Sequence, residues 1–127
     1  MELLSYSDVH PMNLQSFNEL PQEFFKLAPN EIHQIFSEPT LIRYGKGSKK
    51  PAFFSTLLHG NETTGFLALQ RLLKERPHFD RELMIFIGNP QAARQGLRML
   101  PDQTDFNRVW DEKSKVTYAF AGELLQQ

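Results

Sequence analysis

Two apolar runs separated by one amphipathic pattern constrain the fold of this chain more than any other feature. Residues 52–58 form a nearly continuous apolar run between Pro51 and Gly60, and residues 83–87 form a second run. Between them, residues 62–76 repeat apolar side chains at helical spacing and end before a proline. Strand, helix and strand within about 35 residues predict a βαβ unit, with parallel strands joined by a right-handed crossover. We expect both strands to be buried on both faces.

The flanking segments predict smaller elements, so the expected fold class is α/β, a mostly parallel or mixed sheet with flanking helices. In chain order these segments are a helical N-terminal leader over 1–39, a strand over 40–44, a loop over 45–51, a short helix over 90–98 and a last helix over 115–127. The short helix opens with Pro90, which suits a first helical position. A sheet this small needs further cover, so residues 40–127 look like the front part of a larger domain.

The composition argues against several classes of protein. The 127 residues carry a net charge of -1, with 40% apolar residues, 23% charged residues and no cysteine. A net charge this small creates no electrostatic field that would attract nucleic acid or an anionic membrane. No apolar stretch approaches the roughly 18 residues of a membrane helix. The lack of cysteine excludes disulfides and fits a reducing compartment, and the first ten residues do not read as a signal peptide. We therefore expect a cytoplasmic protein without nucleic-acid or membrane partners.

The first motif with chemistry is His59-Gly60-Asn61-Glu62, which directly follows the first predicted strand. The carboxyl ends of parallel strands are where α/β sheets place their ligand sites, and His and Glu are two of the usual ligands of a catalytic zinc. The alternative is a capped helix start, with Asn61 as N-cap and Glu62 favoured by the helix dipole. These residues alone leave both interpretations open, and no second His is well placed for a His₂Glu site.

The second motif, Arg98 followed by Asp105-Phe106-Asn107-Arg108, comes after the second strand and so lies at the same end of the sheet as His59. Two Arg and an Asn suit an anionic substrate, because Arg binds a carboxylate through two parallel hydrogen bonds. Asp105 is suited to accept the free N–H of a metal-bound His. The alternative is a solvated loop whose arginines pair with nearby aspartates, and spacing alone favours it.

Together the two motifs resemble the succinylglutamate desuccinylase/aspartoacylase family, a branch of the zinc carboxypeptidase-like hydrolases. The first is similar to the family's HGNE block, and residues 85–110 are similar to its GNP…A…G.R…D.NR.(F/W) pattern. Both blocks in the right order, over about residues 52–111, are far more specific than either alone. The resemblance implies that residues 40–127 are the N-terminal portion of a zinc carboxypeptidase-like domain.

The resemblance also implies a zinc-dependent amide hydrolase that releases an acyl group, such as succinate or acetate, from a small anionic N-acyl amino acid. The resemblance assigns roles to six residues. His59 and Glu62 would bind one Zn²⁺ per site, and Arg98 would be catalytic, polarising the scissile carbonyl. Asn107 and Arg108 would bind the substrate carboxylate, and Asp105 would support the zinc-bound His.

Two parts of the family pattern do not occur in these residues. They are the second zinc His, in a DLH-like block, and the general-base Glu, both of which lie later in family members. We therefore expect the chain to be incomplete and nearly inactive alone. Two other functions stay open: a carboxypeptidase-like peptide hydrolase, and a catalytically inactive short family member that binds an anion or a partner. The sequence is also compatible with a homo-oligomer.

Overall fold

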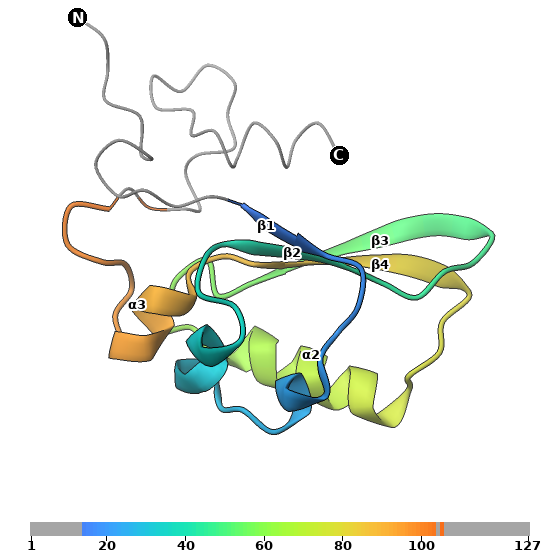
Figure 1. Cartoon of the computed structure of the whole chain (residues 1–127), viewed down its shortest axis with the longest axis horizontal. Coiled ribbons are helices and arrows are strands. Elements are labelled where there is room, and N and C mark those ends of the chain that lie inside the picture. The colour runs from blue at the N-terminus through green and yellow to red at the C-terminus, as the bar shows by residue number, and fades with distance from the viewer. Residues whose placement is uncertain (1–13, 104, 106–127) are drawn as a thin grey trace, which may run out of the picture.

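The computed structural model describes residues 14–103 and residue 105, and this part folds into a sheet with helices. In chain order the elements are β1 (Gln15–Phe17), the 3₁₀ helices η1 (Gln22–Phe25) and η2 (Pro29–Gln34), β2 (Thr40–Tyr44), β3 (Lys49–Thr56), α2 (Thr64–Glu75), β4 (Arg81–Ile87) and α3 (Pro90–Gln95). The described helices all lie on one face of the sheet (Figure 1). The result is a two-layer α/β arrangement with its core between the layers.

The sheet is mixed, with strand order β1-β2-β4-β3. β1 runs parallel to β2, β2 antiparallel to β4, and β3 parallel to β4. The predicted fold class is therefore confirmed, and β3, α2 and β4 form the predicted βαβ unit. Thr56 at the end of β3 pairs with Ile87 at the end of β4. The loops that follow these two strands consequently leave the sheet side by side.

β3 differs from the prediction of a strand buried on both faces. Within the described residues it pairs with β4 alone, which makes it an edge strand. Phe53 is 52% exposed and Phe54 is 38% exposed. The prediction of full burial is therefore wrong for this part of the chain. The strand also begins at Lys49, inside the predicted loop, and it tolerates Pro51 because an edge strand can lose a backbone N–H.

α2 ends as its sequence predicts, whereas α3 ends earlier. α2 buries Phe66, Leu69 and Leu73 at helical spacing and stops two residues before Pro77. α3 is shorter than predicted, because Gly96 adopts a left-handed conformation with φ 68° and caps it directly after Gln95.

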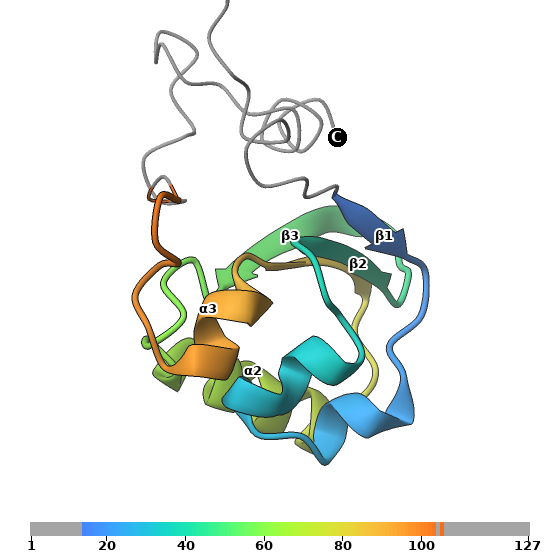
Figure 2. The same cartoon turned by 60° about the vertical axis from the view of Figure 1, so that its left-hand side comes forward.

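One hydrophobic core joins the sheet, α2 and the 3₁₀ helices, which lie beside α2 and α3 in Figure 2. Phe24 of η1 meets Phe66 of α2 edge to face at a centroid distance of 5.4 Å. Ile32 of η2 and nearby Phe36 are buried in the same cluster. The described part of the leader thus shares the core and also supplies the unpredicted strand β1. Within residues 14–103, the structure contains no helix long and apolar enough to cross a membrane.

Candidate metal centre

The backbone after β3 turns sharply to present His59. Leu57 adopts φ 56°, a left-handed conformation that is rare for a bulky residue. Its carbonyl accepts the Asn89 N–H at 2.7 Å, which ties the end of β3 to the residues after β4. Two residues later the His59 side chain is almost fully buried, with 6% of the residue exposed. The imidazole is therefore fixed at the carboxyl end of the parallel pair.

Gly60 brings this turn into contact with the segment that contains Arg98. Its N–H donates to the Arg98 carbonyl at 3.0 Å. A Cβ atom at this position would lie 2.6 Å from the Leu97 carbonyl oxygen and closer still to backbone atoms of Ala92 and Ala93. Only glycine fits this approach, so residue 60 is what allows the His59 turn to pack against α3.

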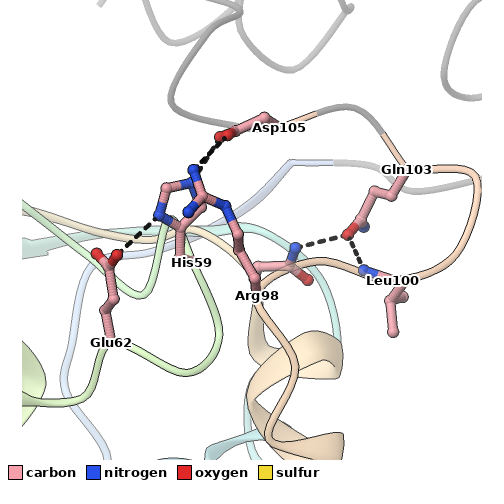
Figure 3. Close-up of polar contacts among 7 residues, drawn as sticks. His59, Glu62, Arg98, Leu100, Gln103 and Asp105 are labelled. Carbon is pink, nitrogen blue, oxygen red and sulfur yellow. Dashed lines mark hydrogen bonds and ion pairs between the residues drawn. The ribbon is translucent and has the colours of Figure 1, made fainter.

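The two ring nitrogens of His59 face different carboxylates (Figure 3). Nδ1 lies 3.1 Å from Oε1 of Glu62, and Nε2 lies 2.7 Å from Oδ1 of Asp105. The Asp105 side chain is 12% exposed, whereas that of Glu62 is 69% exposed. When the carboxylate of Asp105 accepts a hydrogen bond from Nε2–H, the lone pair of Nδ1 points toward Glu62 and solvent. This tautomer is the one that a metal ligand through Nδ1 requires.

These atoms fit two positions of a zinc site. Ligands on a tetrahedral zinc, with bonds of about 2.0–2.1 Å, lie roughly 3.4 Å apart, close to the observed separation of 3.1 Å between Nδ1 and Oε1. An orienting carboxylate on the far ring nitrogen is the usual companion of a metal-bound His. Residues 14–103 and 105 contain no group of three or more acidic, His or Cys side chains that could hold a metal. His59 and Glu62 are thus a pair of donors, short of the three protein ligands of a catalytic zinc.

Arg98 lies beside the same carboxylate. Its Nη2 donates to Oδ2 of Asp105 at 3.3 Å, and its side chain is 54% exposed. An arginine paired with an aspartate is what the solvated-loop alternative predicts, but Asp105 also contacts His59. One bond to Asp105 uses one of the five N–H donors of a guanidinium. Within residues 14–103 and 105 the Arg98 side chain makes no other hydrogen bond, and its exposed part faces solvent.

A buried amide pair holds the loop between Arg98 and Asp105, and sequence reasoning missed it. Asn89 is fully buried, caps α3 by accepting the Ala92 N–H at 3.2 Å, and donates its amide to Oε1 of Gln103 at 2.6 Å. The same Oε1 accepts the Leu100 N–H at 2.8 Å (Figure 3). The Asn-Pro sequence was a readable helix-start signal, but Gln103 carries no local signal for its contact 14 residues away.

The residues between His59 and α2 do not form the predicted alternative of a capped helix start. α2 begins at Thr64 with Thr63 as N-cap, without a side-chain capping bond, so the alternative of Asn61 as N-cap is wrong. Glu62 instead closes a turn, with its N–H donating to the His59 carbonyl at 3.1 Å.

The structure brings together His59, Glu62, Arg98 and Asp105, whereas Asn107 and Arg108 lie outside the described residues.

A hollow of about 550 Å³ opens beside this cluster, lined by the end of β3 and the start of α2, with Glu62 in its wall. Its volume is within the range of about 300–1,000 Å³ typical of small-molecule sites. The Oγ1 of Thr56 lines the same region and is buried without a hydrogen-bond partner in the part of the chain described. Thr56 and Glu62 are both among the residues that line this hollow.

Comparison with known proteins places this cluster in a family. The family model of the succinylglutamate desuccinylase/aspartoacylase catalytic domain matches residues 51–123, more than half of the chain. The chain belongs to this family. The match contains all six residues to which the family resemblance assigns roles, from His59 to Arg108.

One curated relative matches about half of the chain. A succinylglutamate desuccinylase of Serratia proteamaculans (strain 568) is 35% identical over 68 residues, which are 50% of this chain and 20% of the relative. The chain therefore matches about a fifth of that desuccinylase. No solved structure matches the chain.

Proposed function

We propose that this chain carries part of the active site of a zinc-dependent amide hydrolase that releases an acyl group from an N-acyl amino acid. The observation that carries the proposal is the pair of contacts to His59. Glu62 lies at 3.1 Å from Nδ1, where the two donors can share a metal, and Asp105 lies at 2.7 Å from Nε2, where it fixes the tautomer. Membership of the desuccinylase/aspartoacylase family supports the reaction class.

The residues of the cluster divide the chemistry among them. Zinc, when bound by His59 and Glu62, would act as a Lewis acid and activate water near neutral pH. Asp105 holds the His59 ring in one orientation, and the buried position of that ring limits its freedom. The exposed part of the Arg98 guanidinium would donate to the carbonyl oxygen under attack. One such donor is worth about 3 kcal/mol in the transition state.

The substrate is proposed to be a small anion, such as N-succinylglutamate or N-acetylaspartate. Asn107 and Arg108 would bind its carboxylate, because Arg forms two parallel hydrogen bonds with a carboxylate and Asn adds a directional donor. Residues 14–103 and 105 contain no group of three side chains that could hold the metal, so the proposal requires a further ligand. We therefore expect the 127-residue chain to bind zinc weakly and to turn over slowly.

The zinc part of the proposal is tested by titrating the 127-residue chain with Zn²⁺ in competition with a chromophoric chelator. His59→Gln retains an amide near the place of Nε2 but lacks Nδ1, and Glu62→Gln retains size but lacks charge. We expect weak binding at one equivalent, reduced at least about 10-fold in each variant. His33→Gln is the matched control, because His33 contacts the Asn30 carbonyl far along the chain from the cluster. Equal affinity in all four proteins would overturn the ligand assignment.

The catalytic part is tested by the release of glutamate or aspartate from the two N-acyl amino acids. Arg98→Ala should mainly lower kcat, since its contact is made with the developing oxyanion, and Arg108→Ala should mainly raise KM. Equal effects of both changes on both parameters would contradict this division of roles. Tightly held stoichiometric zinc with rapid turnover would contradict the incomplete ligand set, unless a partner subunit completes it.

A further inference from the structure

The contacts around Asn89 point to one more residue that acts on this site. Asp105 is the group that orients His59, yet it lies in a loop after α3 rather than in a strand or helix. An orienting carboxylate must itself be held in place, because metal sites lose affinity when their supporting groups move. The loop therefore needs an anchor close to Asp105.

Gln103 is the anchor nearest in sequence, two residues before Asp105. It is 7% exposed, and its Oε1 accepts two donors, the Asn89 amide at 2.6 Å and the Leu100 N–H at 2.8 Å. A backbone bond from the Gln103 N–H to the Leu100 carbonyl, at 3.1 Å, closes the same turn. Asp102 has φ 64° at the third position of this turn, the arrangement of a type II turn with Pro101 before it.

Asn89, which donates to Gln103, is itself held in place by its burial and its hydrogen bonds. It has no exposed surface, its side chain caps α3, and its N–H donates to the Leu57 carbonyl two residues before His59. Asn89 therefore contacts both sides of the cluster: the turn that presents His59 and, through Gln103, the loop that presents Asp105. Because Oε1 is buried, its loss would leave the Asn89 amide and the Leu100 N–H without an acceptor, which is costly.

We propose that Gln103 is a positioning residue for the metal centre: it fixes the Arg98–Asp105 loop onto Asn89, and so holds Asp105 against Nε2 of His59. The proposal rests on the proposed function only where it concerns metal affinity. Its effect on the His59 ring is a property of the chain without metal.

The test compares Gln103→Leu, which removes the acceptor at similar size, with the wild-type 127-residue chain. In nitrogen-15 NMR spectra at one fixed pH, the Nε2–H proton of His59 should be visible in the wild type, because its hydrogen bond to Asp105 and the burial of the ring slow its exchange with water. In Gln103→Leu this resonance should broaden or disappear through faster exchange with water. The zinc affinity should fall by about 10-fold, the lower end of the range for the loss of an orienting group.

A double-mutant cycle separates a positioning role from a general loss of stability. If Gln103 acts through Asp105, Gln103→Leu should weaken zinc binding in the wild type but have little further effect in Asp105→Asn. Gln91→Leu is the matched control, because Gln91 lies in α3 and donates to the Ser37 carbonyl at 2.9 Å, away from the loop. It should leave both the His59 resonance and zinc affinity unchanged.

Asn89→Asp provides a second variant should Gln103→Leu fail to fold, as checked by circular dichroism. Aspartate keeps the helix cap but loses the donor to Gln103, so the same changes are expected. A folded Gln103→Leu or Asn89→Asp chain with a wild-type His59 resonance would overturn the proposal, as would additive effects in the cycle. If the wild type binds no zinc, the proposed function fails, and the metal-free resonance alone decides the role of Gln103.

Discussion

Gly60→Ala tests whether close packing of the His59 turn on α3 holds the candidate site together. The new methyl group would lie 2.6 Å from the Leu97 carbonyl oxygen and closer to backbone atoms of Ala92 and Ala93. All of these are backbone atoms, so no flexible side chain can move away and α3 itself must shift. Overpacking of this kind typically costs about 1–3 kcal/mol. We expect the upper part of that range, reduced by about 0.4–1 kcal/mol because alanine has less freedom in the unfolded chain.

The control for this substitution is Gly96→Ala at the end of α3. No atom lies within 4 Å of a Cβ there, but φ is 68°, so the cost is conformational, about 1 kcal/mol. Urea unfolding of the 127-residue chain, followed by circular dichroism, measures both free energies of unfolding. Gly60→Ala should be the less stable of the two, by about 1 kcal/mol given these ranges. A Gly60→Ala chain as stable as the wild type would refute the packing argument.

Three further substitutions have distinct expected outcomes. Gly65→Ala should raise the free energy of unfolding by about 0.5–1 kcal/mol, since a Cβ in this helix meets only Thr56 Oγ1 at an ordinary 3.5 Å; a loss in urea unfolding would contradict it. Asp105→Asn should weaken zinc binding about 10- to 100-fold by removing the charge that orients His59; chelator competition showing a change below about 3-fold would count against that role. Burial raises the pKa of the Glu38 carboxyl, so the folded chain binds the carboxyl proton more tightly than the unfolded chain does. The free energy of unfolding therefore falls as the pH rises from the pKa of this carboxyl in the unfolded chain to its pKa in the folded chain. Glu38→Gln should therefore stabilise the chain at pH 7 and not at a pH below the ordinary glutamate range, and equal gains at both pH values would be inconsistent with this cause.

The βαβ unit could be predicted because both of its strands and its helix carry their own periodicity. The apolar run of β3 predicted a strand correctly, but it did not predict that the strand would lie at an edge. Burial depends on which strands pair with it, and a single segment carries no information on its neighbours. Phe53 and Phe54, read as core residues, are consequently exposed within the described part of the chain.

The small elements were harder to predict for different reasons. β1 has only three residues, which is too short for an alternating pattern to stand out, and it forms because Gln15–Phe17 pairs with the start of β2. α3 was predicted to continue to Arg98, but the left-handed conformation of Gly96 ends it after Gln95. A glycine followed by a leucine and an arginine permits either outcome, and packing of the turn against Gly60 favours the shorter helix.

The proximity of His59, Glu62 and Arg98 was predictable, because they lie in the segments that follow the carboxyl ends of two parallel strands, whereas their roles stay predictions. The position of Asp105 on Nε2 agrees in geometry with what the resemblance implies, although its role stays a prediction. Gln103 could not be found in this way. Its amide matters because the fold places Asn89 against it in a buried environment, and such tertiary contacts leave no mark in local sequence.

The central claim is that His59 offers Nδ1 to a metal shared with Glu62 while Asp105 keeps the proton on Nε2. A zinc titration of the nitrogen-15-labelled chain, at one fixed pH, tests it most directly by following the two ring nitrogens of each histidine. We predict that the His59 Nδ1 resonance shifts with added zinc while Nε2 keeps its proton. A shift at Nε2 instead, or a response confined to the other three histidines of the sequence, would contradict the claim.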